Sequence, residues 1–113
     1  MNKQLIQIRN LNKRYKYSNA YFSVLDNLNL EISNAEIISV IGPSGVGKTT
    51  LLNIIGLLDS FNSGEYCFND FDVAKLNIKL KNKFRNEFIG FVHQFFHLIP
   101  ELSVIENVAL PKM

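Results

Sequence analysis

Apolar and polar residues alternate in the first third of the chain, which is typical of strands. Within 24–32, the apolar residues Leu28, Leu30 and Ile32 alternate with the polar residues Asn27, Asn29 and Glu31, so we expect a strand with one solvated face. A shorter run at 5–8 predicts an earlier strand. Residues 10–20 are polar and aromatic without a period, and we expect a loop there.

Two further runs are almost continuously apolar. They cover residues 37–41 and 88–92, and a run of this kind predicts a strand that is covered on both faces, as in a parallel sheet. The turn residues Ser33-Asn34-Ala35 separate the first of these runs from the alternating strand. A short strand is expected at 65–68, followed by a turn at 69–70.

Helical spacing of apolar residues predicts three helices. The first spans about 48–58, and the second spans 75–87 with lysines between its apolar positions, as in an amphipathic surface helix. The third begins at Ser103, where Ser103 and Glu106 have the spacing of a capping box, and ends at Pro111.

Composition narrows the class of protein. The 113 residues are 47% hydrophobic and 19% charged, which is typical of one globular domain rather than of a disordered chain. A net charge of +2 is too small to favour nucleic acid as a partner. The single cysteine, Cys67, excludes an internal disulfide and is expected to be a small core residue. We also expect no membrane span, no signal peptide and a cytoplasmic location.

The segment Gly42-Pro43-Ser44-Gly45-Val46-Gly47-Lys48-Thr49-Thr50 has the complete spacing of a phosphate-binding loop. A strand is expected before it and a helix after it, and that context favours a phosphate site over a glycine-rich turn that fits the motif by chance. Glycines allow the backbone N–H groups to converge on an anion, and the start of a helix adds further donors. Lys48 is expected to contact the terminal phosphates of ATP, and the Thr49 hydroxyl to bind Mg²⁺.

The order of these features resembles the first half of an ATP-binding cassette (ABC) transporter ATPase. The resemblance implies an α/β fold of the P-loop NTPase class, with an antiparallel β subdomain and part of a parallel RecA-like core. It also implies that Tyr15 stacks on adenine, since a flat aromatic face suits any base. By chemistry alone, the neighbouring aromatic residues Tyr17, Tyr21 and Phe22 are alternatives for this stacking. A plain surface or core role for Tyr15 is a further alternative.

A second landmark of the resemblance is Gln94, which follows the apolar run Gly90-Phe91-Val92. In the family this glutamine contacts Mg²⁺ and the attacking water, a task that suits a neutral amide oxygen. Without the resemblance, Gln94 is a polar residue at the end of a strand. The loop at 94–102 is implied to contact the transmembrane subunits.

The segment 94–111 is similar to that of the LolD-type ATPases of the lipoprotein-releasing system, whereas the macrolide-exporter and cell-division ATPases of the same group differ there. This implies ATP-driven release of lipoproteins, by a dimer of ATPase subunits, on the inner face of the bacterial inner membrane. His93 has no catalytic partner nearby in sequence, and His97 is expected to be a packing residue.

Other motifs of the family have no counterpart in these residues: the signature segment, the Walker B carboxylates and the switch histidine. Asp59 ends an apolar run but follows the phosphate loop on its helix, so it is expected to point away from the nucleotide. Leu102-Ser103 is not the start of a signature segment. We therefore expect residues 1–113 to be a partial nucleotide-binding domain that is unstable alone and does not turn over ATP.

Three interpretations stay open. The chain is part of an ABC ATPase subunit; or it is an ATP-binding module that needs a separate C-terminal polypeptide; or it is a non-catalytic fragment that docks on transporter membrane subunits through 94–102.

Overall fold

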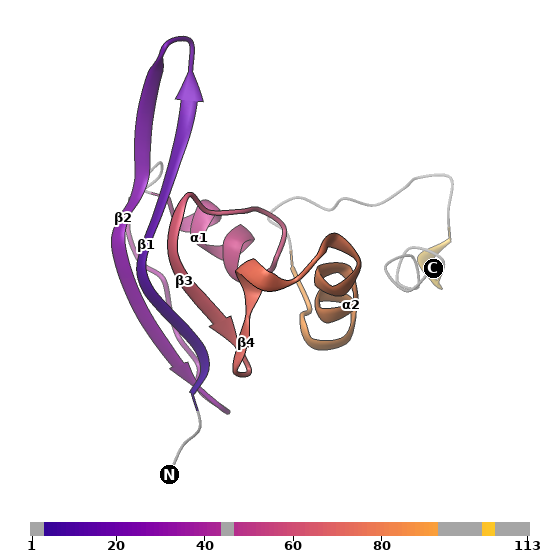
Figure 1. The fold of residues 1–113 in the computed structure, drawn as a ribbon. Helices are drawn as coiled ribbons and strands as arrows, with labels where there is room; N and C mark the ends of the chain where they lie inside the picture. The colour runs from indigo at the N-terminus through magenta and orange to yellow at the C-terminus, as the bar shows by residue number, and fades with distance from the viewer. Residues whose placement is uncertain (1–3, 44–46, 93–102, 106–113) are drawn as a thin grey trace.

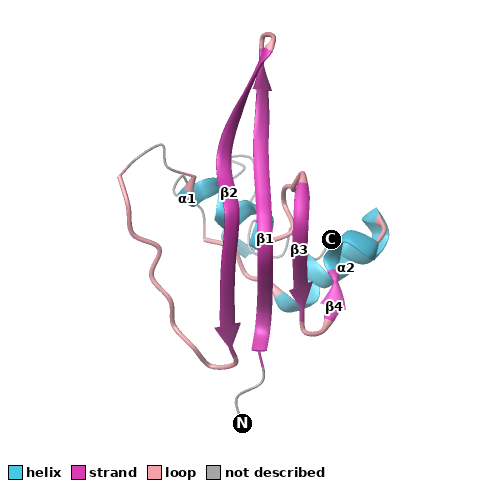
Figure 2. Cartoon of the chain, turned by 60° about the vertical axis from the view of Figure 1, so that its left-hand side comes forward, coloured by secondary structure: helices cyan, strands magenta, loops and turns pink. Residues whose placement is uncertain are grey.

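A computed structural model describes residues 4–43, 47–92 and 103–105. Four strands form one sheet in the order β2-β1-β3-β4, and every neighbouring pair is antiparallel. The strands are β1 (Gln4–Tyr17), β2 (Ala20–Ser33), β3 (Ser63–Phe68) and β4 (Phe71–Asp72). Helices α1 (Lys48–Ile55) and α2 (Ile78–Phe88) lie on one side of this sheet, as Figures 1 and 2 show.

Strands β1 and β2 form a hairpin that is longer than the sequence predicts. The expected loop at 10–20 is wrong, because both strands continue to a turn at Ser18-Asn19. Cross-strand aromatic contacts account for the difference: the rings of Tyr17 and Phe22 lie 6.5 Å apart, and Arg14 lies 5.5 Å from the ring of Tyr21. Such pairs stabilise a hairpin without any apolar alternation that a sequence pattern would reveal.

The core lies between the sheet and α1. Ile8, Leu11, Ile54 and Tyr66 are its most completely buried large side chains. The predicted alternation over 24–32 is confirmed, since the apolar residues of β2 pack against this core and the polar residues between them are exposed. One face of the hairpin is therefore covered by α1 and the other is open to solvent.

Strand β3 confirms the predicted short strand and places Cys67 differently from the expectation. Its neighbours Tyr66 and Phe68 are buried, whereas Cys67 is half-buried on the opposite face. Burial, followed by the nearby carboxylates of Asp72 and Glu65, raises the pKa of the Cys67 thiol. Cys67 is thus not a core residue, and it is not an activated thiol either.

The predicted helices after the phosphate loop are confirmed with shifted ends. Helix α1 ends at Ile55 rather than at residue 58, with Gly56 as its C-cap, and Leu57 has a left-handed φ of 61°. The predicted helix at 75–87 is divided into a 3-10 turn, η1 (Val73–Lys75), and α2. The division occurs because the Asn77 side chain caps α2 by accepting from the Leu80 N–H at 2.8 Å.

Helix α2 is the amphipathic surface helix that its lysines predict, and none of its residues is fully buried. Its apolar contact is made by aromatic rings: Phe84 lies 5.1 Å from Phe71 and 6.4 Å from Phe68. These contacts attach α2 to β3 and β4.

The two strands expected at 37–41 and 88–92 are not formed. Residues 36–43 run as a loop, Phe88 ends α2, and residues 89–92 are not in a strand (Figure 2). Ile37 and Val92 are each 96% exposed. A strand of a parallel sheet needs neighbouring strands for its hydrogen bonds, and in the described part of the chain no strand lies beside either run.

Val104 and Ile105 are helical, which agrees with the helix expected after Ser103, but the rest of that segment lies outside the described residues. Among the residues described, no helix is long and apolar enough to cross a bilayer.

Candidate phosphate-loop site

Gly47 connects the phosphate loop to α1 in a conformation that requires glycine. Its φ is 98°, and it occupies the N-cap position of α1 without a side-chain cap. A Cβ atom at this position would lie 2.8 Å from Val24 Cγ1 and 3.1 Å from the Val24 carbonyl oxygen. The loop therefore approaches the backbone of β2 more closely than any other residue type would allow.

Lys48 reaches back across the loop. Its ammonium Nζ donates a hydrogen bond to the carbonyl oxygen of Gly42, so the positive charge lies beside the first residue of the loop. Ser44, Gly45 and Val46, between these two residues, lie outside the described part of the chain. Lys48 and Gly42 thus hold the two ends of the loop together.

The first turn of α1 offers free donors beside this lysine. The Leu51 N–H is bonded to the Gly47 carbonyl at 2.9 Å, and the N–H groups before it have no partner within the helix. The first turn contains no acidic residue, so the positive end of the helix is not neutralised by its own side chains. Thr49 is exposed at this end, and Thr50 is half-buried. Such a set of donors fits a phosphate group.

The expected context of the loop is formed only in part. The helix after it is present, but the strand before it is not, because residues 37–41 are a loop. Identification of the motif therefore depends on α1, on Gly47 and on the comparisons with known proteins, rather than on a complete strand-loop-helix unit.

Tyr15, on β1, lies beside this helix. Its hydroxyl donates to Asp59 Oδ2 at 2.9 Å and lies 3.5 Å from Thr50 Oγ1. The three alternative aromatic residues, Tyr17, Tyr21 and Phe22, lie at or near the turn end of the hairpin and are more than half exposed. Of the four, Tyr15 is the residue that contacts both Thr50 of α1 and Asp59 of the loop after it.

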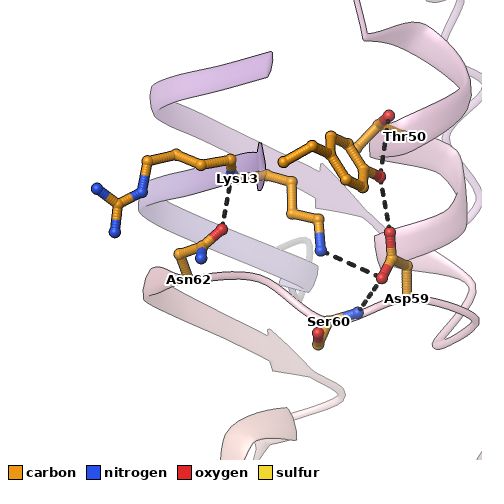
Figure 3. Close-up of polar contacts among 7 residues, drawn as sticks. Lys13, Thr50, Asp59, Ser60 and Asn62 are labelled. Atoms are coloured by element: carbon orange, nitrogen blue, oxygen red, sulfur yellow. Dashed lines mark hydrogen bonds and ion pairs between the residues drawn. The ribbon is translucent and has the colours of Figure 1, made fainter. Parts of the chain in front are cut away.

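Asp59 joins several of these groups, which Figure 3 draws together. Its Oδ1 atom accepts from Lys13 Nζ at 3.2 Å and from the Ser60 N–H at 2.8 Å. Burial raises the pKa of the Asp59 carboxyl, but the hydrogen bonds from Tyr15, Ser60 and Lys13, with the charge of Lys13, outweigh it and hold the pKa below its ordinary value. Asp59 is therefore ionised at neutral pH.

The sequence gives no indication of this cluster. Asp59 lies 44 residues from Tyr15 and 46 from Lys13, so no local spacing connects them. Asn62 supplies another link, since its side chain accepts from the Arg14 N–H at 2.7 Å. Only the pairing of β1 with the segment after α1 brings these residues together.

The predicted roles of Gln94, of the loop at 94–102, and of His93 and His97 fall outside the described residues. Within the described ranges, no three His, Cys, Asp or Glu side chains are grouped so as to hold a metal ion. The exposed hydroxyl of Thr49 fits Mg²⁺ only as one ligand among others, and phosphate oxygens would supply the rest.

A cleft of about 540 Å³ lies between the end of α1 and α2. Leu57, Ser60, Val73 and Arg85 are among its lining residues, and Arg85 Nη1 donates to the Leu57 carbonyl at 2.9 Å. None of the described residues of the phosphate loop, 42–43 and 47–50, lines this cleft, so the cleft is separate from them.

Comparisons with known proteins agree with this geometry. The sequence profile of the family described as ABC transporter matches residues 25–113. Two solved structures of the ATP-binding cassette MJ0796 are 42% and 43% identical in sequence to this chain. Each match covers 94% of the residues of this chain with a TM-score of 0.89. One is described as a dimeric post-hydrolysis state bound to ADP and Pi, and the other as the dimeric structure of a bacterial ABC transporter cassette. The chain spans 46% of each of these proteins, about half their length.

Proposed function

Because the chain belongs to the ABC transporter family, we propose that it binds Mg-ATP as the N-terminal part of a transporter ATPase subunit. The single observation that carries the proposal is the position of Lys48 Nζ, bonded to the Gly42 carbonyl beside the first-turn N–H groups of α1, which have no partner within the helix. A cation and several N–H groups directed at one place are what a polyphosphate requires.

In this proposal each residue contacts a different part of the nucleotide. Lys48 contacts the terminal phosphates, residues 42–50 surround the phosphate tail, and Tyr15 stacks on the base. Thr49 and Gln94 are the proposed protein ligands of Mg²⁺. When bound, the metal neutralises charge on the phosphate oxygens.

The wider assignment is a proposal as well. Residues 1–113 are the partial nucleotide-binding domain of a LolD-type subunit, peripheral on the inner face of the bacterial inner membrane. It forms a dimer of ATPase subunits and contacts transmembrane subunits through 94–102. The support is the sequence of 94–111 and the family to which the chain belongs.

One observation favours a second candidate, an ATP-binding module completed by a separate polypeptide. Ile37, Ile41 and Val92 are each more than 90% exposed, although apolar runs of this kind are normally covered on both faces. A partner that supplies the missing strands would cover them. Co-expression with a separate C-terminal cassette segment, such as the part of MJ0796 beyond the matched region, tests this candidate. A stable complex of the two polypeptides is the expected result, and two polypeptides that purify separately would contradict it.

Binding of Mg-ATP to the purified chain, measured by isothermal titration calorimetry, tests the main proposal. Lys48→Ala removes a charge-assisted contact, so the affinity should fall about 10-fold to 100-fold, the equivalent of about 1.5–3 kcal/mol. Lys79→Ala, which removes an exposed lysine of α2, is the matched control and should leave affinity unchanged.

If the chain does not fold by itself, the same variants are to be measured in a fusion to the remaining part of the MJ0796 cassette, whose sequence continues beyond the matched region. Equal affinities of wild type and Lys48→Ala in a folded protein would contradict the proposal.

A further inference from the structure

We propose that Asp59 is a positioning residue for base recognition, which fixes the ring of Tyr15 against the start of α1 so that one face of the ring stays open to a base. This inference deepens the function proposed above and depends on it. The observations that carry it are three hydrogen bonds to one carboxylate and the position of Lys13 over the ring.

The hydroxyl of Tyr15 is held at the far end of its side chain. The 2.9 Å bond to Asp59 Oδ2 and the approach of Thr50 Oγ1 to 3.5 Å restrict rotation of the ring, which is 41% exposed. An exposed tyrosine without these contacts would sample several rotamers, and ordering it would oppose binding. The hydrogen bonds order the ring before a ligand arrives.

Lys13 determines which face of the ring is available. Its Nζ atom lies 4.9 Å from the centroid of the Tyr15 ring and 3.2 Å from Asp59 Oδ1. The Lys13 side chain is only 10% exposed, so its ammonium cannot move away without losing the carboxylate partner. A flat base can therefore stack only on the face opposite Lys13.

Asp59 is itself fixed to the phosphate-binding helix. The backbone N–H groups of Leu58 and Asp59 both donate to the Asn53 carbonyl of α1, at 2.8 and 3.2 Å. The Ser60 N–H then holds the carboxylate at 2.8 Å. Through Asp59, the position of the Tyr15 ring is tied to α1, at whose start the phosphate loop ends.

A direct role of Asp59 as a metal ligand does not fit these contacts. Oδ1 accepts two hydrogen bonds and Oδ2 accepts one, from Lys13, Ser60 and Tyr15. In the described ranges Asp59 is part of no group of three metal-ligating side chains. The carboxylate is used to hold other residues.

Comparison of two ligands separates base recognition from phosphate binding. ATP carries a base, whereas inorganic triphosphate offers only the phosphate chain. Both ligands are titrated calorimetrically, in the presence of Mg²⁺, into the full chain or the MJ0796 fusion. Asp59→Ala should weaken ATP binding by about threefold to tenfold and leave triphosphate binding unchanged. Asp59→Asn keeps an acceptor oxygen and should fall between Asp59→Ala and wild type.

A double-mutant cycle tests whether Asp59 acts through the tyrosine hydroxyl. Tyr15→Phe keeps the ring but removes the hydroxyl, so the effect of Asp59→Ala on ATP affinity should be smaller in this background. Matched controls are Tyr17→Phe and Asp26→Ala, which alter exposed residues of the same hairpin and should leave the ratio of ATP to triphosphate affinity unchanged.

An unchanged ratio in folded Asp59→Ala and Tyr15→Phe variants would overturn this inference while leaving the phosphate site intact. Equal loss of both ligands in Asp59→Ala would also overturn it, because the residue would then act on the fold alone. If Lys48→Ala changes neither affinity, the proposed function itself fails, so the two failures are distinguishable.

Discussion

Gly47→Ala is the substitution that tests the geometry of the phosphate loop most directly. The new Cβ would meet Val24 Cγ1 at 2.8 Å, and this side chain could move; it would also meet the Val24 carbonyl oxygen at 3.1 Å, which is backbone and could not. In addition, the φ of 98° is unfavourable for any residue with a Cβ atom.

These two effects give the expected magnitude. A left-handed conformation costs about 1–2 kcal/mol in a residue with a Cβ atom, and overpacking adds about 1–3 kcal/mol. A loss of about 3 kcal/mol in the free energy of unfolding corresponds to a melting temperature lowered by roughly 10 °C for a domain of this size.

The assay is thermal unfolding followed by circular dichroism, on the chain or, if it does not fold alone, on the MJ0796 fusion, with Gly90→Ala as matched control. A Cβ at Gly90 would meet no atom within 4 Å, and its φ is not in the left-handed region, so this variant should melt within about 2 °C of wild type. Val24→Ala removes the Cγ1 contact and should restore part of the stability of Gly47→Ala, but not all of it, since the backbone contact and the φ remain. If Gly47→Ala melts with wild type, the close approach of the loop to β2 is wrong.

Two other predictions concern polar contacts. Tyr66 is 0% exposed, burial raises its pKa, and its hydroxyl donates to the Ile55 carbonyl at 2.6 Å. Tyr66→Phe should therefore lower the free energy of unfolding, measured by urea titration, by about 1–2 kcal/mol. A gain in stability would contradict this prediction. The pKa of Asp59 lies below its ordinary value of 3.8, so its contribution to stability is present above pH 3.8 and is lost as the pH falls through the lower, folded-state pKa. Melting temperatures between pH 5 and pH 2.5 should therefore fall less steeply in Asp59→Asn than in wild type, and parallel curves would refute this assignment.

The parts of the fold that depend on local patterns could be predicted from the sequence. The alternation in β2, the amphipathic spacing of α2 and the start of α1 after Gly47 are all confirmed. Each reflects a preference of a segment for one solvent-exposed face or for one capping position, and such preferences act within a few residues of sequence.

The parts that depend on long-range contacts could not. The part of the β1–β2 hairpin near its turn is stabilised by rings and cations that face each other across the two strands, such as Arg14 and Tyr21. Residues 37–41 have the composition of a buried strand, but composition does not supply the neighbouring strands that a parallel sheet needs. Asp59 and Tyr15 meet because β1 lies beside the segment after α1, and no spacing rule connects them.

The hairpin of β1 and β2 contributes to both parts of the proposed nucleotide site, because Tyr15 belongs to β1 and β2 supplies Val24, next to which Gly47 packs. Tyr15 pairs with Phe22, two residues before Val24, so the spacing between the proposed base-stacking ring and the start of α1 is set within one pair of antiparallel strands. Under this proposal, a nucleotide that contacts both the ring and the phosphate loop is matched to the geometry of that strand pair.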